Sequence, residues 1–188
     1  QLLPLLKKIG SPIVSLTGAG GYGTTLAADR GNTNLFTFFK VADGTETGSL
    51  TVTIATNNVS WAQMYRLSNA TGSWSVAGAT GSDTTAGDVS LAFGSNPGVT
   101  AADFILGAMC IPTDVTTPDQ FSAEALSQTG VTFGTVTEIS EPDSTTGYDI
   151  GGFVVQAPVS SGTGSANPTM TATAGGTTTN VRGPGVFI

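Results

Sequence analysis

The sequence predicts an all-β protein: a single, two-layer, jelly-roll-like β-sandwich of roughly ten to twelve antiparallel strands with an N-terminal extension. Three observations point to this class. Leu, Lys and Glu rarely recur at the 3.6-residue spacing of an amphipathic helix. Short runs rich in Val, Thr and aromatic residues recur instead, bounded by Gly, Pro, Asn and Asp. In addition, 26 of the 188 residues are glycines, which suit the turns between short strands.

The alternating runs set the limits of the expected strands. The small-residue stretches Thr80–Gly87 and Ser160–Asn167 are expected to be loops, too short to separate two cores, so residues 12–188 should form one domain. The expected strands are Ile13–Thr17, Thr24–Ala28, Asn34–Ala42, Ser49–Thr56, Val59–Leu67, Asp88–Phe93, Asp103–Ile111, Phe121–Ser127, Val131–Ile139, Tyr148–Val159, Thr169–Ala174 and Asn180–Ile188.

Two of these runs carry further predictions. The clearest expected hairpin joins Leu35–Val41 to Ser49–Ile54, because Leu and Val alternate with Thr in the second run and turn-forming residues lie between the two. The run Asp103–Ile111 is almost continuously apolar after its first residue, which indicates a central strand buried on both faces. Cys110 lies inside that run, so we interpret it as a small core residue.

The composition excludes several classes of function. The chain has no histidine, which rules out a Ser-His-Asp or Cys-His catalytic unit. Its single cysteine allows no internal disulfide and no structural zinc site. A net charge of −7 makes nucleic acid a poor partner, and no apolar run approaches the roughly 18 residues of a membrane span. We therefore expect no enzyme activity, no cofactor and no metal.

The charges are distributed unevenly along the chain. No Lys or Arg occurs between Leu67 and Val181, although ten of the thirteen acidic residues do. Natural β-proteins often place Lys on exposed sheet edges to block unwanted strand pairing. Here the edges are expected either to be covered by loops or to pair with another chain, and an acidic surface with no special purpose is the simpler alternative.

Other candidate sites have plain structural explanations. Glu138 and Glu141 resemble a carboxylate pair, but an acidic loop near a strand end explains them better than a glycosidase site. An aromatic shelf for sugars built from Trp61, Tyr65, Trp74 and Phe93 is less well supported than packing of these side chains in a core.

The N-terminal segment, residues 1–11, has the most unusual pattern. Its apolar residues precede a Gly-Ser-Pro break that should end any local structure. The segment could be the remains of a signal peptide, could fold back on its own domain as a strand or a helical turn, or could insert into a neighbouring copy. The residues of this expected assembly arm are Leu2, Leu3, Leu5, Leu6 and Ile9.

Insertion into a neighbouring copy is the interpretation that we favour. A donated strand would satisfy the unpaired backbone groups of an incomplete sheet. Burying four or five Leu or Ile side chains would contribute about 8 kcal/mol before ordering costs. Such a contact is head to tail, and it generates an open filament unless its rotation closes a ring.

Four stretches resemble a known family. They are Phe38–Glu46, Leu50–Thr53, Tyr65–Gly72 and Ala101–Ala108, in this order and spacing. Together they resemble β-sandwich structural proteins, of virion or tail type, from bacteriophages and environmental sequences. The resemblance covers residues 12–160 and implies a particle component without known catalytic residues. The family opens with an apolar strand, and here only residues 1–10 hold its place.

These observations lead to one expected function and one alternative. We expect a non-enzymatic structural protein that self-assembles into an extracellular, pilus-like filament or fibril, with identical subunits joined head to tail by N-terminal donor-strand exchange. The alternative is a bacteriophage virion component, a capsid decoration or tail protein. Asn58 and Asn69 match the N-glycosylation pattern, so glycans on an extracellular surface are also possible partners.

Overall fold

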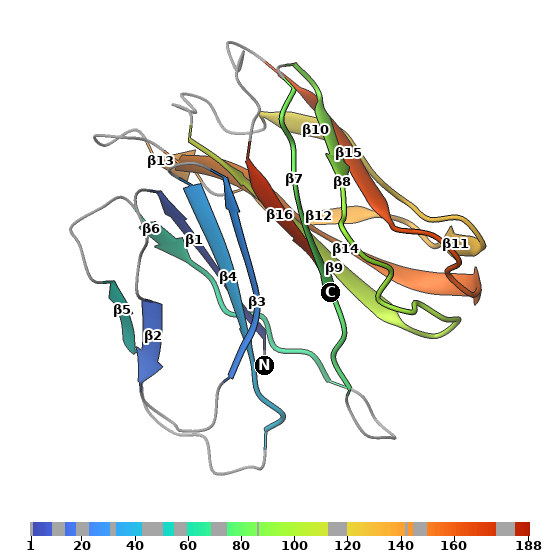
Figure 1. Ribbon diagram of the computed structural model, residues 1–188, viewed down its shortest axis with the longest axis horizontal. Helices are drawn as coiled ribbons and strands as arrows, with labels where there is room; N and C mark the ends of the chain where they lie inside the picture. Colours follow the sequence, from blue (N-terminus) through green and yellow to red (C-terminus); the bar gives the residue numbers. More distant parts are fainter. Residues whose placement is uncertain are drawn as a thin grey trace.

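The computed structural model shows an all-β protein, as the sequence predicts (Figure 1). It describes residues 2–8, 14–17, 23–30, 33–42, 51–54, 60–68, 75–85, 87–112, 120–141, 143–144, 150–175 and 183–188. Strands in these ranges pair antiparallel throughout, and the ranges contain no helix. Hence none of the described segments is a helix of the length and apolarity that a membrane crossing requires.

The described strands follow the chain in short steps. They are β1 (Leu2–Lys8), β2 (Val14–Thr17), β3 (Gly23–Arg30), β4 (Thr33–Phe39), β5 (Thr51–Ile54), β6 (Ser60–Ala62), β7 (Ala79–Ser82), β8 (Val89–Ala92), β9 (Phe104–Ile111), β10 (Phe121–Ser127), β11 (Val131–Phe133), β12 (Thr137–Ser140), β13 (Asp143–Ser144), β14 (Ile150–Gly162), β15 (Thr169–Ala174) and β16 (Pro184–Phe187).

A seven-stranded sheet lies at the centre of the fold. Its main path is β11-β14-β9-β16-β7, and β12 and β13 pair with other parts of the long strand β14. A three-stranded sheet, β10-β15-β8, covers one face of it, and a four-stranded sheet, β3-β4-β1-β6, lies toward the other face (Figure 1). Strands β2 and β5 form a separate two-stranded ribbon. The sandwich therefore has a third layer in addition to the two expected layers.

The first core lies between the central sheet and β10-β15-β8. Its aromatic rings come from both layers: Phe121 of β10 packs against Phe153 of β14 with ring centroids 4.9 Å apart. Phe93 similarly packs against Phe187 of β16, at 5.4 Å. All four side chains are at most 4% exposed. Since buried aromatic side chains carry the largest apolar areas, this core should dominate the stability of the fold.

The second core lies on the opposite face of the central sheet. Strands β3 and β4 contact β16, β7 and β9 there. Leu35 of β4 is fully buried in this core, and Trp61 and Tyr65 pack against it while remaining partly exposed. Ala108 and Cys110 reach it from β9 and Val154 from β14. The side chains are mostly small or aliphatic, so the layer is held by less apolar area than the first one.

Strand β9 confirms the prediction of a strand buried on both faces. Seven of its eight residues are buried, all except the first, Phe104. Met109 and Ile111 point to the first core, whereas Ala108 and Cys110 point to the second. Alternation along the strand thus places successive side chains in different layers, which explains why the run contains no polar residue.

The expected hairpin between Leu35–Val41 and Ser49–Ile54 is wrong. Strand β4 pairs with β3 and β1, while β5 pairs with β2. Both edges of β4 are therefore occupied, and the connection formed by residues 40–50 is too long to impose a tight turn. The alternation identified both strands, but it did not identify their partners.

Other strand limits agree closely with the expectations or differ for local reasons. Strands β10 and β15 have the predicted limits. The expected strand Val131–Ile139 is divided into β11 and β12, which pair with separate stretches of β14. The stretch Thr80–Gly87 was expected to be a loop, but it contains most of β7, which pairs with β16. An all-β sandwich is thus established, and the jelly-roll strand order stays a prediction.

Candidate assembly site

The N-terminal strand β1 lies in the interior of the four-stranded sheet. It pairs with β4 over its whole length, from Leu2 opposite Phe39 to Lys8 opposite Thr33. On its other side, Leu5–Lys7 pair with Ala62–Ser60 of β6. The described part of β4 does not pair with β6, and β1 joins them. The segment therefore occupies a slot between two strands instead of extending the sheet at an edge.

Strand β4 forms the rigid side of this slot. Leu35, Thr37 and Phe38 are at most 3% exposed. On the far side from β1, the hydroxyl of Thr37 accepts a hydrogen bond of 3.1 Å from the N–H of Leu26, next to a bulge in β3. The bulge leaves this N–H outside the regular ladder, and the threonine compensates for the loss. Strand β4 is thereby held in place independently of β1.

Pro4 occupies a position in β1 where a proline is tolerated. It pairs with Thr37 of β4, while the ladder to β6 begins only at Leu5. Proline has no N–H to donate, so it fits where a strand lacks a partner on one side. The limits of the β6 ladder thus agree with the sequence of the slot strand.

The structure places the residues of the expected assembly arm in two groups. Leu2, Leu3, Leu5 and Leu6 lie in β1, paired with strands of their own chain, which is the arrangement that the fold-back interpretation predicts. Ile9 lies outside the described residues, as do Asn58 and Asn69, so the glycosylation sites stay predictions. Exchange of β1 between copies likewise stays a prediction.

Acidic residues in the part of the chain without Lys or Arg bind backbone N–H groups. Asp83 is 1% exposed. Its Oδ1 accepts hydrogen bonds of 2.8 Å from the N–H and the hydroxyl of Thr85, and its Oδ2 accepts one of 2.6 Å from the N–H of Ser90 in β8. A buried carboxylate with three donors needs no basic partner. This explains how the region combines many acids with no Lys or Arg.

Three further carboxylates act in the same way. Glu141 accepts hydrogen bonds from the N–H groups of Gln120 and Phe121 at the start of β10, and Asp88 accepts one from Ala174 at the end of β15. Asp103 accepts two from Thr100. Glu141 therefore has a structural role, in line with the interpretation of Glu138 and Glu141 as part of an acidic loop region. The Asp83-x-Thr85 spacing of an Asx turn was a signal that the sequence analysis missed.

The sheet edges are interrupted by bulges. Register shifts occur in β3, β10, β11 and β12, each of which lies at an edge of its sheet. The bulge in β10 contains Ala123, which has a positive φ of 55°. A bulged strand is a poor template for an added strand, so these edges are protected without Lys. This answers the question raised by the uneven charge distribution for the described edges.

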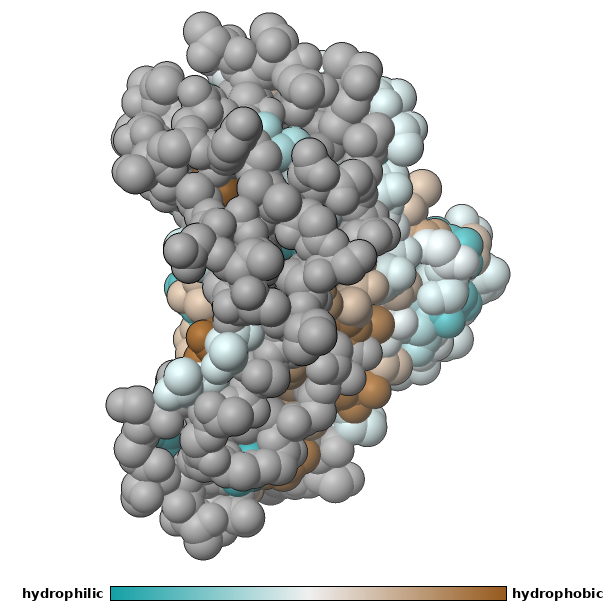
Figure 2. Space-filling model, turned by 60° about the vertical axis from the view of Figure 1, so that its left-hand side comes forward, coloured by the Kyte–Doolittle hydropathy of each residue, from teal (hydrophilic) through white to brown (hydrophobic). Residues whose placement is uncertain are grey.

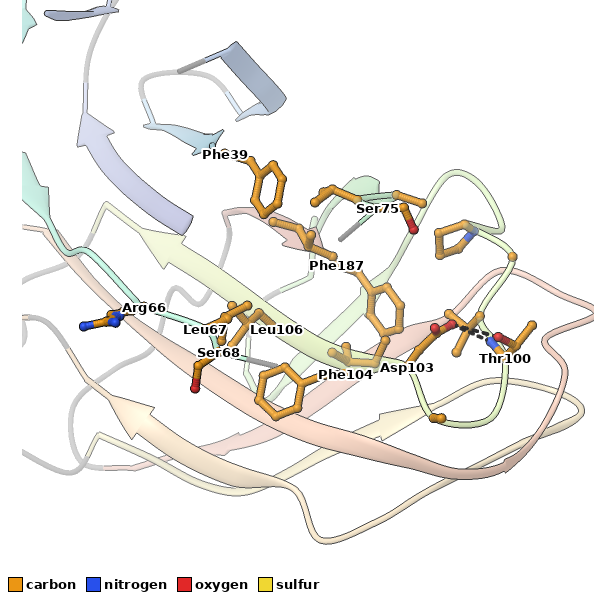
Figure 3. Close-up of a pocket in the computed structure, with 18 residues that line it drawn as sticks. Phe39, Arg66, Leu67, Ser68, Ser75, Thr100, Asp103, Phe104, Leu106 and Phe187 are labelled. Carbon is orange, nitrogen blue, oxygen red and sulfur yellow. Dashed lines mark hydrogen bonds between the residues drawn. The ribbon is translucent and has the colours of Figure 1, made fainter. Parts of the chain in front are cut away.

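The largest hollow found in the described part of the chain begins where β1 begins. It has a volume of about 830 Å³ and is lined by Phe39, by the segment Arg66–Ser68, by Ser75–Ala77 and by parts of residues 97–106 and 187–188. Phe39 is the partner of Leu2 in the ladder, so the hollow continues the slot beyond the start of β1. Figure 3 shows Arg66 at one end of it and Asp103 at the other, with Phe104 between them.

The remaining candidate residues pack in the cores. Phe93 is 2% exposed in the first core, and Trp61 and Tyr65 pack against the second, as the core interpretation predicts for these three. Burial raises the pKa of the Cys110 thiol well above its usual value. A buried, protonated thiol is a poor nucleophile. Among the described residues, no group of His, Cys, Asp or Glu side chains is arranged to hold a metal ion.

Comparison with known proteins adds no relative. No protein-family model matches the chain, and neither the curated proteins nor the solved structures contain a match. The resemblance to virion and tail proteins of bacteriophages therefore stays a prediction from the sequence, and the proposals below rest on the geometry of this chain.

Proposed function

We propose that this protein is a non-enzymatic structural subunit of an extracellular filament, assembled by exchange of β1 between neighbouring copies. The observation that supports the proposal best is the interior position of β1 between β4 and β6. A strand in this position makes backbone hydrogen bonds on both sides, so the sheet is incomplete without it. In the filament, β1 of one copy fills the slot of the next.

The energetics of exchange favour this mechanism. The ladders to β4 and β6 contain the same residues whether β1 comes from the same chain or from another. The net free energy of exchange then depends mainly on the connection between β1 and β2 and on protein concentration. The Gly10-Ser11-Pro12 sequence lies in that connection. Because proline and the residue before it disfavour a helix, an extended connection to a neighbouring subunit is compatible with this sequence.

Removal of residues 1–10 tests the proposal. The truncated chain should remain a soluble monomer, because its slot has no strand to accept from a copy that lacks one. A synthetic peptide of residues 1–10 should then bind the truncated chain at a ratio of one to one. Negative-stain microscopy of the intact and the truncated chains provides the readout. Fibres formed by the truncated chain would contradict the proposal.

A second candidate function is a bacteriophage virion component, a capsid decoration or tail protein. Two observations favour it: β1 completes the sheet of its own chain, and the bulged edges of β3, β10, β11 and β12 disfavour strand addition. Such a protein would act as a self-contained module. Purified intact chain that stays monomeric but coats capsids would support this function, whereas fibres of the protein alone would support the filament.

A further inference from the structure

The hollow beyond β1 has the size and chemistry of a ligand site, and this observation is independent of strand exchange. Its volume of about 830 Å³ is within the range of small-molecule sites. Its walls combine apolar side chains with small hydroxyl side chains, including Leu67, Leu106, Ser68 and Ser75. The coloured surface in Figure 2 is likewise mostly pale, with brown apolar residues visible between the polar ones.

Arg66 determines the charge that such a ligand would carry. It is the only Lys or Arg between residues 41 and 181 of a chain whose net charge is −7, and it lies on the rim of this hollow. The only other charged residue of the lining, Asp103, lies at the opposite end (Figure 3). A guanidinium binds a carboxylate through two parallel hydrogen bonds. The Arg66 end is therefore suited to an anionic group.

The rest of the hollow fits neither an alkyl chain nor a nucleic acid. An alkyl chain would leave Arg66 and Asp103 covered without polar partners, which costs free energy. A nucleic acid would meet one cation in a strongly acidic chain.

A saccharide fits both kinds of wall, because a pyranose ring has apolar C–H faces and a hydroxylated rim. Phe104 is 38% exposed, although every other residue of β9 is buried, so its ring offers a stacking surface. At the far end, Oδ2 of Asp103 accepts both hydrogen bonds from Thr100, and Oδ1 can accept a hydroxyl.

We propose that this hollow binds a short acidic saccharide. The carboxylate of a uronic acid unit pairs with Arg66, a sugar ring stacks on Phe104, and a hydroxyl of the next unit donates to Asp103. A structural subunit with such a site would attach its particle to an acidic polysaccharide.

Titration of the whole chain with trigalacturonic acid, followed by NMR, tests the site. Chemical-shift changes should saturate and should include the amides of Leu67, Thr100 and Phe104. Arg66→Gln should weaken binding by about 10-fold or more, since a charge-assisted pair is lost. Phe104→Ala should weaken it by about 5-fold. Met64→Gln is the matched control, because Met64 is 51% exposed two residues before Arg66 and does not line the hollow.

Several outcomes would overturn the proposal. One is the absence of saturable shifts up to about 10 mM trisaccharide, which is weaker than most specific sites. Another is unchanged affinity in Arg66→Gln and Phe104→Ala, with both variants folded by their amide spectra. Equal binding of the neutral galactose trisaccharide of the same linkage would remove the acidic group from the proposal. Tighter binding of triglutamate would indicate a peptide site instead. None of these outcomes depends on whether the chain forms fibres.

Discussion

The two cores of this protein differ in what holds them together. The first core is built from β7 to β16, all from the second part of the chain, and contains four buried phenylalanine side chains. The described part of the second core contains no fully buried aromatic side chain, and its outer sheet has the N-terminal strand β1 in its interior. The first sandwich closes with neighbouring parts of one chain, whereas the second layer depends on a segment that another copy could supply.

This difference separates stability from assembly. Edges of the first sandwich are interrupted by bulges, and carboxylates such as Asp83 and Glu141 satisfy backbone N–H groups at its margins. These features favour a self-contained unit. The region before residue 68 holds five of the six basic residues and the β1 slot. We therefore expect stability to reside in the first region and interaction in the second.

The largest effect is expected from a cavity in the first core. Phe153→Ala removes a side chain that is fully buried and packs on Phe121, and it should lower the free energy of unfolding by about 3–5 kcal/mol. The loss should be global, because the central sheet is shared by all layers. Urea denaturation and amide hydrogen exchange of β9 and β14 provide the measurements.

Leu35→Ala is the matched change in the second core. Leu35 is also fully buried, but its loss should mainly release β1, β3, β4 and β6, with protection retained in β10 and β15. Equal loss of amide protection in both regions would show that the two layers unfold as one unit, contrary to this account.

A smaller effect is expected at Asp83. Asp83→Asn keeps the shape of the side chain but places an amide N–H₂ group against a backbone or hydroxyl donor, so stability should fall by about 2 kcal/mol. Asp88→Asn is the control, because exposed Asp88 accepts a single hydrogen bond, and it should change stability by less than about 1 kcal/mol. Similar losses in both variants would contradict the assigned role of Asp83.

The smallest effect concerns alkaline pH and the second core. Burial raises the pKa of Cys110, and it also raises the pKa of Tyr65, where the Ser140 hydroxyl opposes the rise. Because the folded state keeps these protons longer than the unfolded state, stability should fall as the pH rises above the unfolded pKa values, about 8.5 for Cys and 10 for Tyr.

Thermal unfolding of the wild type and of Cys110→Ala between pH 7 and 10 would measure this effect. Below the range in which Tyr titrates, the melting temperature of the variant should depend less on pH. Identical pH profiles of the two proteins would show that the Cys110 thiol does not contribute.

The sequence predicted the strands better than their partners. The limits of β10 and β15 follow from alternation and turn residues, and the two-faced burial of β9 follows from its continuous apolar run. Pairing is different, because one period of alternation suits any neighbour, so β5 was assigned to β4 instead of β2. A second continuous run, Ile150–Val155 in β14, was a signal for a central sheet with cores on both faces.

The candidate site was predictable only in part. The apolar pattern of residues 2–6 indicated that this segment matters, and Pro4 is compatible with its interior position. Sequence alone could not place the hollow, because Phe39, Arg66 and Phe104 come from three distant segments that only the tertiary fold brings together. The caps on Asp83 and Asp103 were accessible from local Asx and hydroxyl patterns.

The central claim is that β1 fills a slot that a second copy can supply. Lys7 and Ser60 are register partners across this slot, and the sole native cysteine is buried, so the variants Lys7→Cys and Ser60→Cys give a clean cross-link. When the two single variants are mixed, assembled and oxidised, the account predicts disulfide-linked dimers between different chains. No dimers from the mixture, with efficient cross-linking within single chains of the double variant, would contradict it.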